Sequence, residues 1–390
     1  MVPAVARAVR ILRYLERQGA RGATLAQIHR TLALNKSTCH NILKTLEQCG
    51  FLEYSPLSKK YELGHAIFEL GISFDRARLH PQRGVRVSPR RLRHRGWGGM
   101  IPDRFEYFAP KTVAEAVGLL QTHGPEAKAL AGGHSLIPLM KLRLAAPRYV
   151  VDLNGISGMA YIREAGDALQ IGALTHHADL ETSDLLRTRY PLLADTARVI
   201  ADPLVRNMGT IGGSLAHADP AGDWGAAMLA ARATVVATGS RGQRTIPIDA
   251  FLVDTFTTAL EPDEILTEIR VPKPPAGSGG AYLKLERKVG DFAIAAVGAY
   301  LVLDGRGKCA QAGIGMCNVG PTSLRAKRAE GLLVGQPPDE GTIAAVSKAA
   351  AEESDPVTDL RGPADYKRDI VRVLTARALR RAVQRAKGGA

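Results

Sequence analysis

Two glycine-centred segments are the residues of this chain best suited to hold an anion. The first is Ala-Gly-Gly-His-Ser at residues 131–135, and the second is Thr-Ile-Gly-Gly-Ser at residues 210–214. Because glycine has no Cβ, the backbone can turn sharply there and direct several N–H groups toward one anion. Two loops of this kind can hold a pyrophosphate, and the flanking residues then decide which cofactor carries it.

The motifs of several other cofactor and catalytic classes are absent from the sequence. No GxGxxG segment lies between a strand-like and a helical run, which argues against a Rossmann dinucleotide fold. No GxSxG or HExxH segment occurs, so we expect no catalytic residue that activates water or a substrate by itself. The cysteines, which form no CxxC pair, are expected to be reduced and to hold no metal or iron–sulfur cluster: Cys39, Cys49, Cys309 and Cys317.

Adjacent histidines at His176 and His177 are a further candidate for a metal site. Neighbouring side chains of a strand point to opposite faces, so the two imidazoles are not expected to share an ion. The sequence therefore predicts no metal site.

The elements that must position the two glycine loops mix helices and strands. Thr112 with Glu115 forms a capping-box pattern at the start of a helix that leads toward the first loop. Strand-like runs are expected at 127–130, 149–153 and 169–172, and a helix at about 192–202 before the second loop. This order predicts an α+β fold.

Residues 100–390 resemble the FAD-binding medium subunit of molybdenum hydroxylases, especially the carbon monoxide dehydrogenase medium subunit and the FAD domain of xanthine dehydrogenases. The resemblance rests on the stretches 129–136, 206–214 with 217–223 (His-Ala-Asp-Pro-Ala-Gly-Asp), and 287–295 (Arg-Lys-Val-Gly-Asp-Phe-Ala-Ile-Ala). It implies an FAD-binding domain of the vanillyl-alcohol-oxidase (PCMH) type at 100–277 and a C-terminal α/β domain of the carbon monoxide dehydrogenase flavoprotein at 278–390.

The resemblance also implies a set of FAD-binding residues. Two loops would wrap the pyrophosphate, chiefly through main-chain N–H groups: Leu130, Ala131, Gly132, Gly133, His134, Ser135 and Leu136, then Thr210, Ile211, Gly212, Gly213 and Ser214. Asp223 would accept hydrogen bonds at the sugar or adenine side, Leu266 would pack near the adenine, and Lys284 would lie by the flavin.

Several of these residues also have plainer interpretations. The glycines can be ordinary turn residues, and Asp223 can be a helix cap. His134 can be a covalent flavin link or a catalytic base, but we interpret it as a residue positioned by its loop, since the family holds FAD noncovalently.

The resemblance places the remaining chemistry on other chains. A molybdopterin-binding large subunit would oxidise the substrate, and a small subunit would relay electrons through two [2Fe–2S] clusters to this FAD. The expected assembly is a dimer of such heterotrimers. The substrate stays open between carbon monoxide, an aldehyde and an N-heterocycle, and the acceptor between a quinone, NAD and a soluble carrier.

The charge of the chain is concentrated in its first quarter. The 390 residues carry a net charge of +14; residues 1–99 hold 18 Lys and Arg against 6 Asp and Glu, and the remainder holds 34 against 32. A local positive excess of this kind indicates a contact surface for nucleic acid or another anion. The near-neutral remainder is typical of an enzyme domain.

Residues 3–74 have the pattern of three short helices followed by a two-stranded wing. A stripe of Val5, Ala8, Leu12 and Leu15 marks the first helix, and Thr24 can cap a second with the apolar face Leu25, Ile28 and Leu32. A third helix is expected from about Asn35 to Gly50 with Cys39, Ile42, Leu43 and Leu46 inside, followed by strands at 51–54 and 60–63.

This first segment resembles the winged helix-turn-helix of IclR-type transcription regulators. The matching stretches are 7–12 (Arg-Ala-Val-Arg-Ile-Leu), 34–38 (Leu-Asn-Lys-Ser-Thr) and 46–52 (Leu-Glu-Gln-Cys-Gly-Phe-Leu). The resemblance implies that the third helix enters the major groove of duplex DNA with Lys36, Ser37, Thr38, His40, Asn41 and Lys44. The plainer interpretation is a solvated helix face, and residues 75–390 do not resemble the sensor domain of such regulators.

An arginine-rich segment, 75–99, joins the two parts. It has eight arginines between Arg76 and Arg95 and no apolar periodicity, so we interpret it as a disordered linker. A basic arm in a DNA groove and a junction between two formerly separate reading frames are alternatives, and Met100 can be a translation start.

Two hypotheses of function therefore stand beside each other. The first is an electron-transferring flavoprotein subunit of a molybdenum hydroxylase with an attached DNA-binding domain, and the second is a transcription regulator with a flavin-binding sensor. No run of about 18 apolar residues and no signal-peptide pattern is present, so we expect a cytoplasmic protein without membrane insertion.

Overall fold

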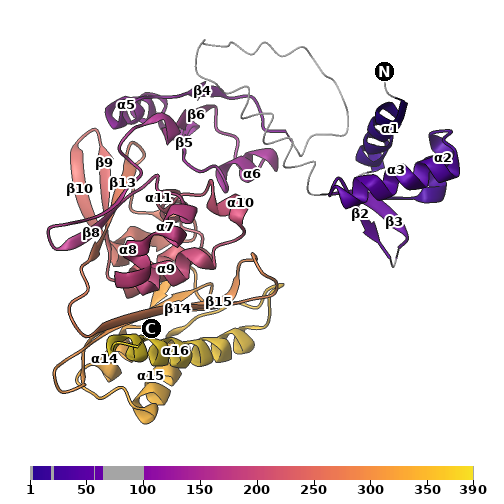
Figure 1. Cartoon of the computed structure of the whole chain (residues 1–390). Helices are drawn as coiled ribbons and strands as arrows, with labels where there is room; N and C mark the ends of the chain where they lie inside the picture. Colours follow the sequence, from indigo (N-terminus) through magenta and orange to yellow (C-terminus); the bar gives the residue numbers. More distant parts are fainter. Residues whose placement is uncertain (1–2, 19–21, 57, 65–100, 390) are drawn as a thin grey trace. The chain divides into compact units, whose positions relative to one another are not determined.

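The computed structural model describes residues 3–18, 22–56, 58–64 and 101–389. The chain divides into two compact units, Met1–Arg93 and His94–Ala390, each of which is treated by itself (Figure 1). The predicted linker at 75–99 and the possible start at Met100 lie outside the described residues.

The first unit contains three helices and a small antiparallel sheet. The helices are α1 (Pro3–Gln18), α2 (Leu25–Thr31) and α3 (Lys36–Gln48), and the sheet has the order β1 (Ala23–Thr24), β3 (Lys60–Leu63), β2 (Leu52–Ser55). The expected winged helix-turn-helix order is thus confirmed.

Side-chain caps explain where the helices of the first unit begin. The Thr24 hydroxyl accepts from Gln27 N in a capping box, and the Asn35 side chain accepts from Ser37 N. The core contains Leu15, Ile28, Cys39 and Leu43 as expected, but the stripe predicted for α1 omits Ile11. In α1 the buried residues are Ile11 and Leu15, while Leu12 is only partly buried.

The second unit begins with a three-stranded parallel sheet of order β4-β6-β5. Its elements are β4 (Glu106–Phe108), α5 (Val113–His123), the 3-10 turn Gly124–Glu126, β5 (Ala127–Leu130), α6 (Leu136–Lys141), β6 (Tyr149–Asp152) and the 3-10 turn Leu153–Gly155. Thr112 caps α5 through Glu115 N, as its position in the sequence predicts. The first glycine loop connects β5 to α6.

A five-stranded antiparallel sheet follows, with the order β10-β9-β13-β8-β7. Its strands are β7 (Ile162–Ala165), β8 (Ala168–Gly172), β9 (Thr234–Gly239), β10 (Gly242–Pro247) and β13 (Ile265–Pro272). Between β8 and β9 the chain forms α7 (His177–Thr182), α8 (Asp184–Arg189), α9 (Pro191–Arg198), α10 (Pro203–Arg206), α11 (Ile211–His217) and α12 (Asp223–Ala230). The short elements α13 (Ile248–Phe251), β11 (Leu252–Asp254) and β12 (Thr257–Thr258) complete this part.

The helix expected at 192–202 is shorter than predicted. α9 ends at Arg198, and Ala201 adopts a left-handed φ of 45° before Asp202 caps the separate helix α10. A left-handed residue interrupts the helical hydrogen bonds, so the apolar run continues as a turn.

The C-terminal part is a four-stranded antiparallel sheet with helices on one face. Its elements are β14 (Ser278–Glu286), β15 (Ala293–Leu303), β16 (Cys309–Cys317), β17 (Leu324–Arg325), α14 (Lys327–Leu333), α15 (Glu340–Glu353) and α16 (Ala364–Ala386). Ala296 packs in the same core as Trp224, whereas Ala295 and Val297 pack in the core beneath the C-terminal helices. Burial on both faces explains why β15 is an uninterrupted apolar run.

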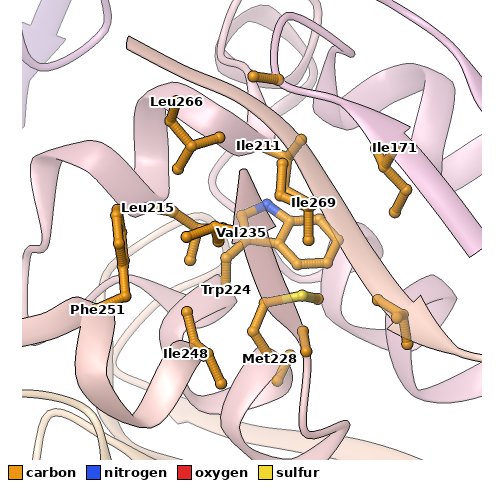
Figure 2. Close-up of a cluster of buried hydrophobic side chains, with 14 of the residues drawn as sticks. Ile171, Ile211, Leu215, Trp224, Met228, Val235, Ile248, Phe251, Leu266 and Ile269 are labelled. Atoms are coloured by element: carbon orange, nitrogen blue, oxygen red, sulfur yellow. The ribbon is translucent and has the colours of Figure 1, made fainter. Parts of the chain in front are cut away.

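Trp224 lies within the larger hydrophobic core of the second unit. Figure 2 shows the indole between side chains of the five-stranded sheet and of the helices, with Leu215, Val235 and Ile269 around it. The α+β fold class is thus as predicted. Among the described residues, no helix is both long and apolar enough to cross a membrane.

Candidate cofactor-binding site

The two glycine loops, which lie far apart in the sequence, meet through their backbones. A Cβ added to Gly132 would lie 2.2 Å from Met208 O and 2.7 Å from Gly209 Cα, and one added to Gly213 would lie 3.4 Å from the Ala131 Cβ. Only glycine at residue 132 permits this approach. The structure therefore brings both predicted segments into one site.

The first loop presents backbone donors without acceptors. The N–H groups of Gly132, Gly133, His134 and Ser135 donate to no acceptor in the described part of the chain. Gly132 is buried, and a buried N–H without an acceptor is costly. Gly133 has a φ of +74°, a conformation found in anion-binding nests of consecutive N–H groups. The loop therefore fits a pyrophosphate.

The second loop uses its N–H groups within the protein. Ile211 N donates to Thr175 O (3.1 Å), Gly212 N to Ala173 O (2.9 Å), and Gly213 N to the hydroxyl of its helix cap, Thr210 (3.1 Å). A Cβ on Gly212 would lie 2.5 Å from the Ala173 Cβ. The resemblance implies that both loops donate N–H groups to the pyrophosphate. In the structure the second loop mainly supplies the surface against which the first one packs.

Asp223 stands at the start of α12, which is held closely against β16. A Cβ added to Gly313 or Gly315 of β16 would lie 2.0 Å from Ala230 O or 1.9 Å from Ala226 O, so only a strand with glycines there admits this helix. The Asp223 carboxylate is buried and does not cap α12, because Gly222 is the cap residue. The helix-cap interpretation of Asp223 is therefore wrong.

The Asp223 carboxylate instead forms a buried pair with Lys284 of β14. It accepts hydrogen bonds from Lys284 Nζ (3.0 Å) and from the Tyr282 hydroxyl (2.8 Å), and Lys284 Nζ also donates to Val199 O (2.9 Å). Burial raises the pKa of Asp223, and the Lys284 ammonium opposes that shift. Asp223 and Lys284 therefore form one buried ion pair at the start of α12.

Glu286 adds a second carboxylate to this pair. Its Oε2 lies 3.6 Å from Lys284 Nζ and is a buried oxygen without a hydrogen-bond partner in the described part of the chain. Neither Tyr282 nor Glu286 is among the predicted site residues. The β14 run Tyr-Leu-Lys-Leu-Glu at 282–286 carries the signal that could have found them, since alternate residues of a strand share one face.

Leu266 of β13 lies in the hydrophobic core and is 5% exposed. Figure 2 shows it above Leu215 of α11. It packs in the same core as Leu215 of α11, the helix whose first turn contains the second glycine segment.

The paired histidines have different surroundings. His177 is buried, accepts a hydrogen bond at Nδ1 from Trp224 Nε1 (3.1 Å), and donates its backbone N–H to Gly209 O beside the second loop. Burial lowers the pKa of His177 to about 3, so the imidazole is neutral. His176 faces outward and lies 3.4 Å from Asp179. Among the described residues, no group of three His, Cys, Asp or Glu side chains could hold a metal ion.

The predicted DNA-contacting residues all lie on α3 of the first unit. Thr38 is half-buried, and the others are exposed: Lys36, Ser37, His40, Asn41 and Lys44. Cys39 and Leu43 face the core. Lys44 is 3.1 Å from Glu47, which offsets part of its charge.

Comparison with known protein families identifies the second unit, with its first glycine loop and additional C-terminal sheet, as an FAD-binding subunit of a molybdopterin-type dehydrogenase. Residues 103–274 match the family described as FAD binding domain in molybdopterin dehydrogenase, and residues 280–382 match the CO dehydrogenase flavoprotein C-terminal domain. Residues 4–56 match the IclR helix-turn-helix domain.

The chain belongs to the family of FAD-binding medium chains of molybdenum-dependent dehydrogenases, and its cofactor is FAD. It is 45% identical over 280 residues to the carbon monoxide dehydrogenase medium chain of Hydrogenophaga pseudoflava, covering 72% of this chain and 97% of that protein. The 6-hydroxypseudooxynicotine dehydrogenase complex subunit alpha of Paenarthrobacter nicotinovorans is 40% identical over 288 residues, or 74% of this chain and 97% of that protein.

Solved structures agree with this assignment. Carbon monoxide dehydrogenase from Hydrogenophaga pseudoflava superimposes with a TM-score of 0.71 at 47% identity, covering 73% of this chain and 99% of that one. Quinoline 2-oxidoreductase from Pseudomonas putida 86 gives a TM-score of 0.69 at 32% identity, covering 74% and 99%. The relatives thus account for the length of the second unit.

Proposed function

We propose that this chain is the electron-transfer subunit of a molybdenum hydroxylase. A separate small subunit would deliver electrons from [2Fe–2S] clusters, and a separate molybdopterin-binding large subunit would oxidise the substrate, in a dimer of heterotrimers. FAD, when bound, would supply the redox chemistry by which this subunit passes electrons to an external acceptor. The proposal rests chiefly on the four N–H groups of residues 132–135 that lack acceptors within the described part of the chain.

The residues of this chain bind and orient the cofactor. The first loop neutralises the pyrophosphate through its backbone dipoles, and the second loop, with its own N–H groups bonded, keeps the first one in place. The pair of Asp223 and Lys284 holds a buried charge of each sign at the junction of α12 and β14. Such fixed charges set the electrostatic environment of a nearby redox group.

The proposed division of the chain is the one expected from the sequence. It comprises the helix-turn-helix domain at 3–74, an arginine-rich linker at 75–99, the FAD-binding domain at 100–277 and the C-terminal domain at 278–390. We propose a cytoplasmic location. The substrate and the acceptor stay open, because the relatives include carbon monoxide, 6-hydroxypseudooxynicotine and glyceraldehyde dehydrogenases.

The test is the visible absorption spectrum of the purified full-length chain with identification of the released cofactor. The double variant Gly132→Asp/Gly212→Asp places carboxylates in both loops and is expected to lose FAD, because the added side chains would lie 2.2 Å from Met208 O and 2.5 Å from the Ala173 Cβ, and the first carboxylate would also repel a pyrophosphate. Gly118→Asp is the matched control, since a Cβ at Gly118 of α5 meets nothing within 4 Å, and it should retain FAD. A folded wild-type chain that takes up no added FAD would overturn the proposal.

A second candidate function is DNA binding by the first unit. It is favoured by the exposed polar face of α3 together with the positive excess of residues 1–99. Binding of the full chain to duplex DNA should weaken steeply with salt, and Lys36→Ala should weaken it on all sequences and lower the salt slope by about 1. Lys128→Ala, in β5 of the second unit, is the control. Salt-independent or absent binding would leave α3 as a solvated helix face.

A further inference from the structure

Asn154 is the side chain that anchors the first glycine loop to the parallel sheet. It lies in the 3-10 turn after β6, and its Nδ2 donates to Ala131 O at 2.8 Å. Ala131 directly precedes Gly132, whose N–H lacks an acceptor in the described part of the chain. Neither the glycine motifs nor the other predicted residues include Asn154.

The hydrogen bond from Asn154 fixes the direction of the Gly132 N–H. Ala131 C=O and Gly132 N–H belong to one planar trans peptide group, in which the two bonds point to opposite sides. An amide that holds the carbonyl on its own side therefore turns the N–H away from itself. The next peptide group is held in a similar way, since Gly132 O lies 2.9 Å from His134 Nδ1 and Gly133 N–H points away from that contact.

Asn154 is itself oriented by residues from the neighbouring strands. Asp152 Oδ1 accepts from both the backbone N (2.9 Å) and the Nδ2 (2.7 Å) of Asn154. The second oxygen of Asp152 accepts from the Tyr107 hydroxyl of β4. Burial raises the pKa of Tyr107, and so does the hydrogen bond to Asp152, so the phenol keeps its proton and donates at neutral pH.

We propose that Asn154 is a positioning residue for the FAD pyrophosphate, acting through the Ala131–Gly132 peptide, with Asp152 and Tyr107 holding its amide. This inference rests on the FAD-binding function of the loop. The relay joins all three strands of the first sheet, because Tyr107 lies on β4, Asp152 ends β6 and the loop follows β5. These hydrogen bonds fix the direction of the Gly132 N–H before FAD binds, and preorganisation of this kind improves affinity.

The test titrates FAD into the apo form of the full chain and follows flavin fluorescence. Asn154→Ala removes the hydrogen bonds of the amide to Ala131 O and to Asp152, and loss of the bond to Ala131 O should raise the Kd for FAD about 5-fold. Asn154→Asp should raise it further, because a carboxylate of nearly the same shape faces Ala131 O and Asp152. The matched control is Gln170→Ala, which removes an amide bonded to Arg163 in the five-stranded sheet and should leave the Kd unchanged.

Thermal unfolding of the apo variants separates positioning from stability. The unfolding temperature of Asn154→Ala should stay within about 3 °C of wild type, as a loss of about 1 kcal/mol or less implies for a domain of this size. A wild-type Kd in both Asn154 variants would overturn the inference, and so would a Kd that rises only where the apo protein is unfolded. A wild-type chain that binds no FAD would overturn the proposed function as well, and is thus a distinguishable result.

Discussion

Substitution of Gly132 by alanine tests the contact between the two loops directly. The added methyl group would lie 2.2 Å from Met208 O and 2.7 Å from Gly209 Cα, and both are backbone atoms of the residues that directly precede the second loop. Ordinary contact needs at least about 3.4 Å, so one loop must move by about 1 Å. Gly209 is anchored by the backbone N–H of His177, so we expect the first loop to be the one that moves.

The free-energy cost of this movement follows from the overpacking of a close contact. Inserting one methyl group into a packed site typically costs about 1 to 3 kcal/mol. If the loop relaxes in the apo protein, FAD binding must restore the strained geometry, and 3 kcal/mol then corresponds to about a 100-fold rise in Kd. If it cannot relax, the same energy appears as a lower free energy of unfolding. The loss of FAD-binding free energy and the loss of unfolding free energy should therefore add up to about 3 kcal/mol, the upper end of the range for overpacking.

Two measurements on apo protein distinguish these cases. FAD titration by fluorescence gives the Kd, and urea unfolding gives the free energy of unfolding. Gly118→Ala is the control, because a methyl group at Gly118 meets nothing within 4 Å and alanine favours a helix interior. That control should gain about 0.5 to 1 kcal/mol in stability and keep the wild-type Kd. Wild-type values of both quantities in Gly132→Ala would refute the backbone contact between the loops.

Two further predictions concern buried ionisable groups. The pKa of His177 is about 3 in the folded chain and 6.5 in its ordinary state, so only the unfolded chain binds the proton between these values. The contribution of neutral His177 to the free energy of unfolding is therefore complete above pH 6.5 and falls by about 1.4 kcal/mol per pH unit toward pH 3. Urea unfolding at pH 4.5 and at pH 7 gives the difference in unfolding free energy between these two pH values. The variant His177→Gln should reduce that difference by about 2 to 3 kcal/mol. Lys284→Met leaves the Asp223 carboxylate buried without its cation and should cost about 3 kcal/mol of unfolding free energy, whereas Asp223→Asn/Lys284→Met should recover much of the loss. Equal losses in the single and double variants would contradict the pairing.

Local signals in the sequence were sufficient to predict where several helices begin. Thr24, Asn35 and Thr112 each begin a helix where a side-chain oxygen can accept from the first turn, and all three do so in the structure. The wing strands followed from alternating residues on both sides of a short turn. Such signals involve contacts within a few residues, so no knowledge of the fold is needed. The end of α9 was missed because apolar periodicity continues past the left-handed turn at Ala201.

The buried pair of Asp223 and Lys284 could not be found in this way. The two residues are 61 positions apart, and their contact exists because α12 packs on glycines of β16 while β14 lies in the same sheet. The resemblance indicated each residue separately and gave them roles at different places on FAD. A sequence motif carries no information on whether two of its polar residues neutralise each other, which depends on the packing between them.

The two Gly-Gly segments show most clearly what a motif leaves undetermined. In sequence they are equivalent, and both can form an anion-binding nest. In the structure Gly212 N is held by Ala173 O, 39 residues earlier in the chain, and its lack of a side chain is required by the approach of Ala173. Gly132 and Gly133 keep their donors free of acceptors in the described part of the chain, because Asn154 and His134 engage the carbonyls of this loop. The same dipeptide thus packs one segment and leaves N–H groups without acceptors in the other, and part of the distinction comes from Ala173 and Asn154, which lie outside both motifs.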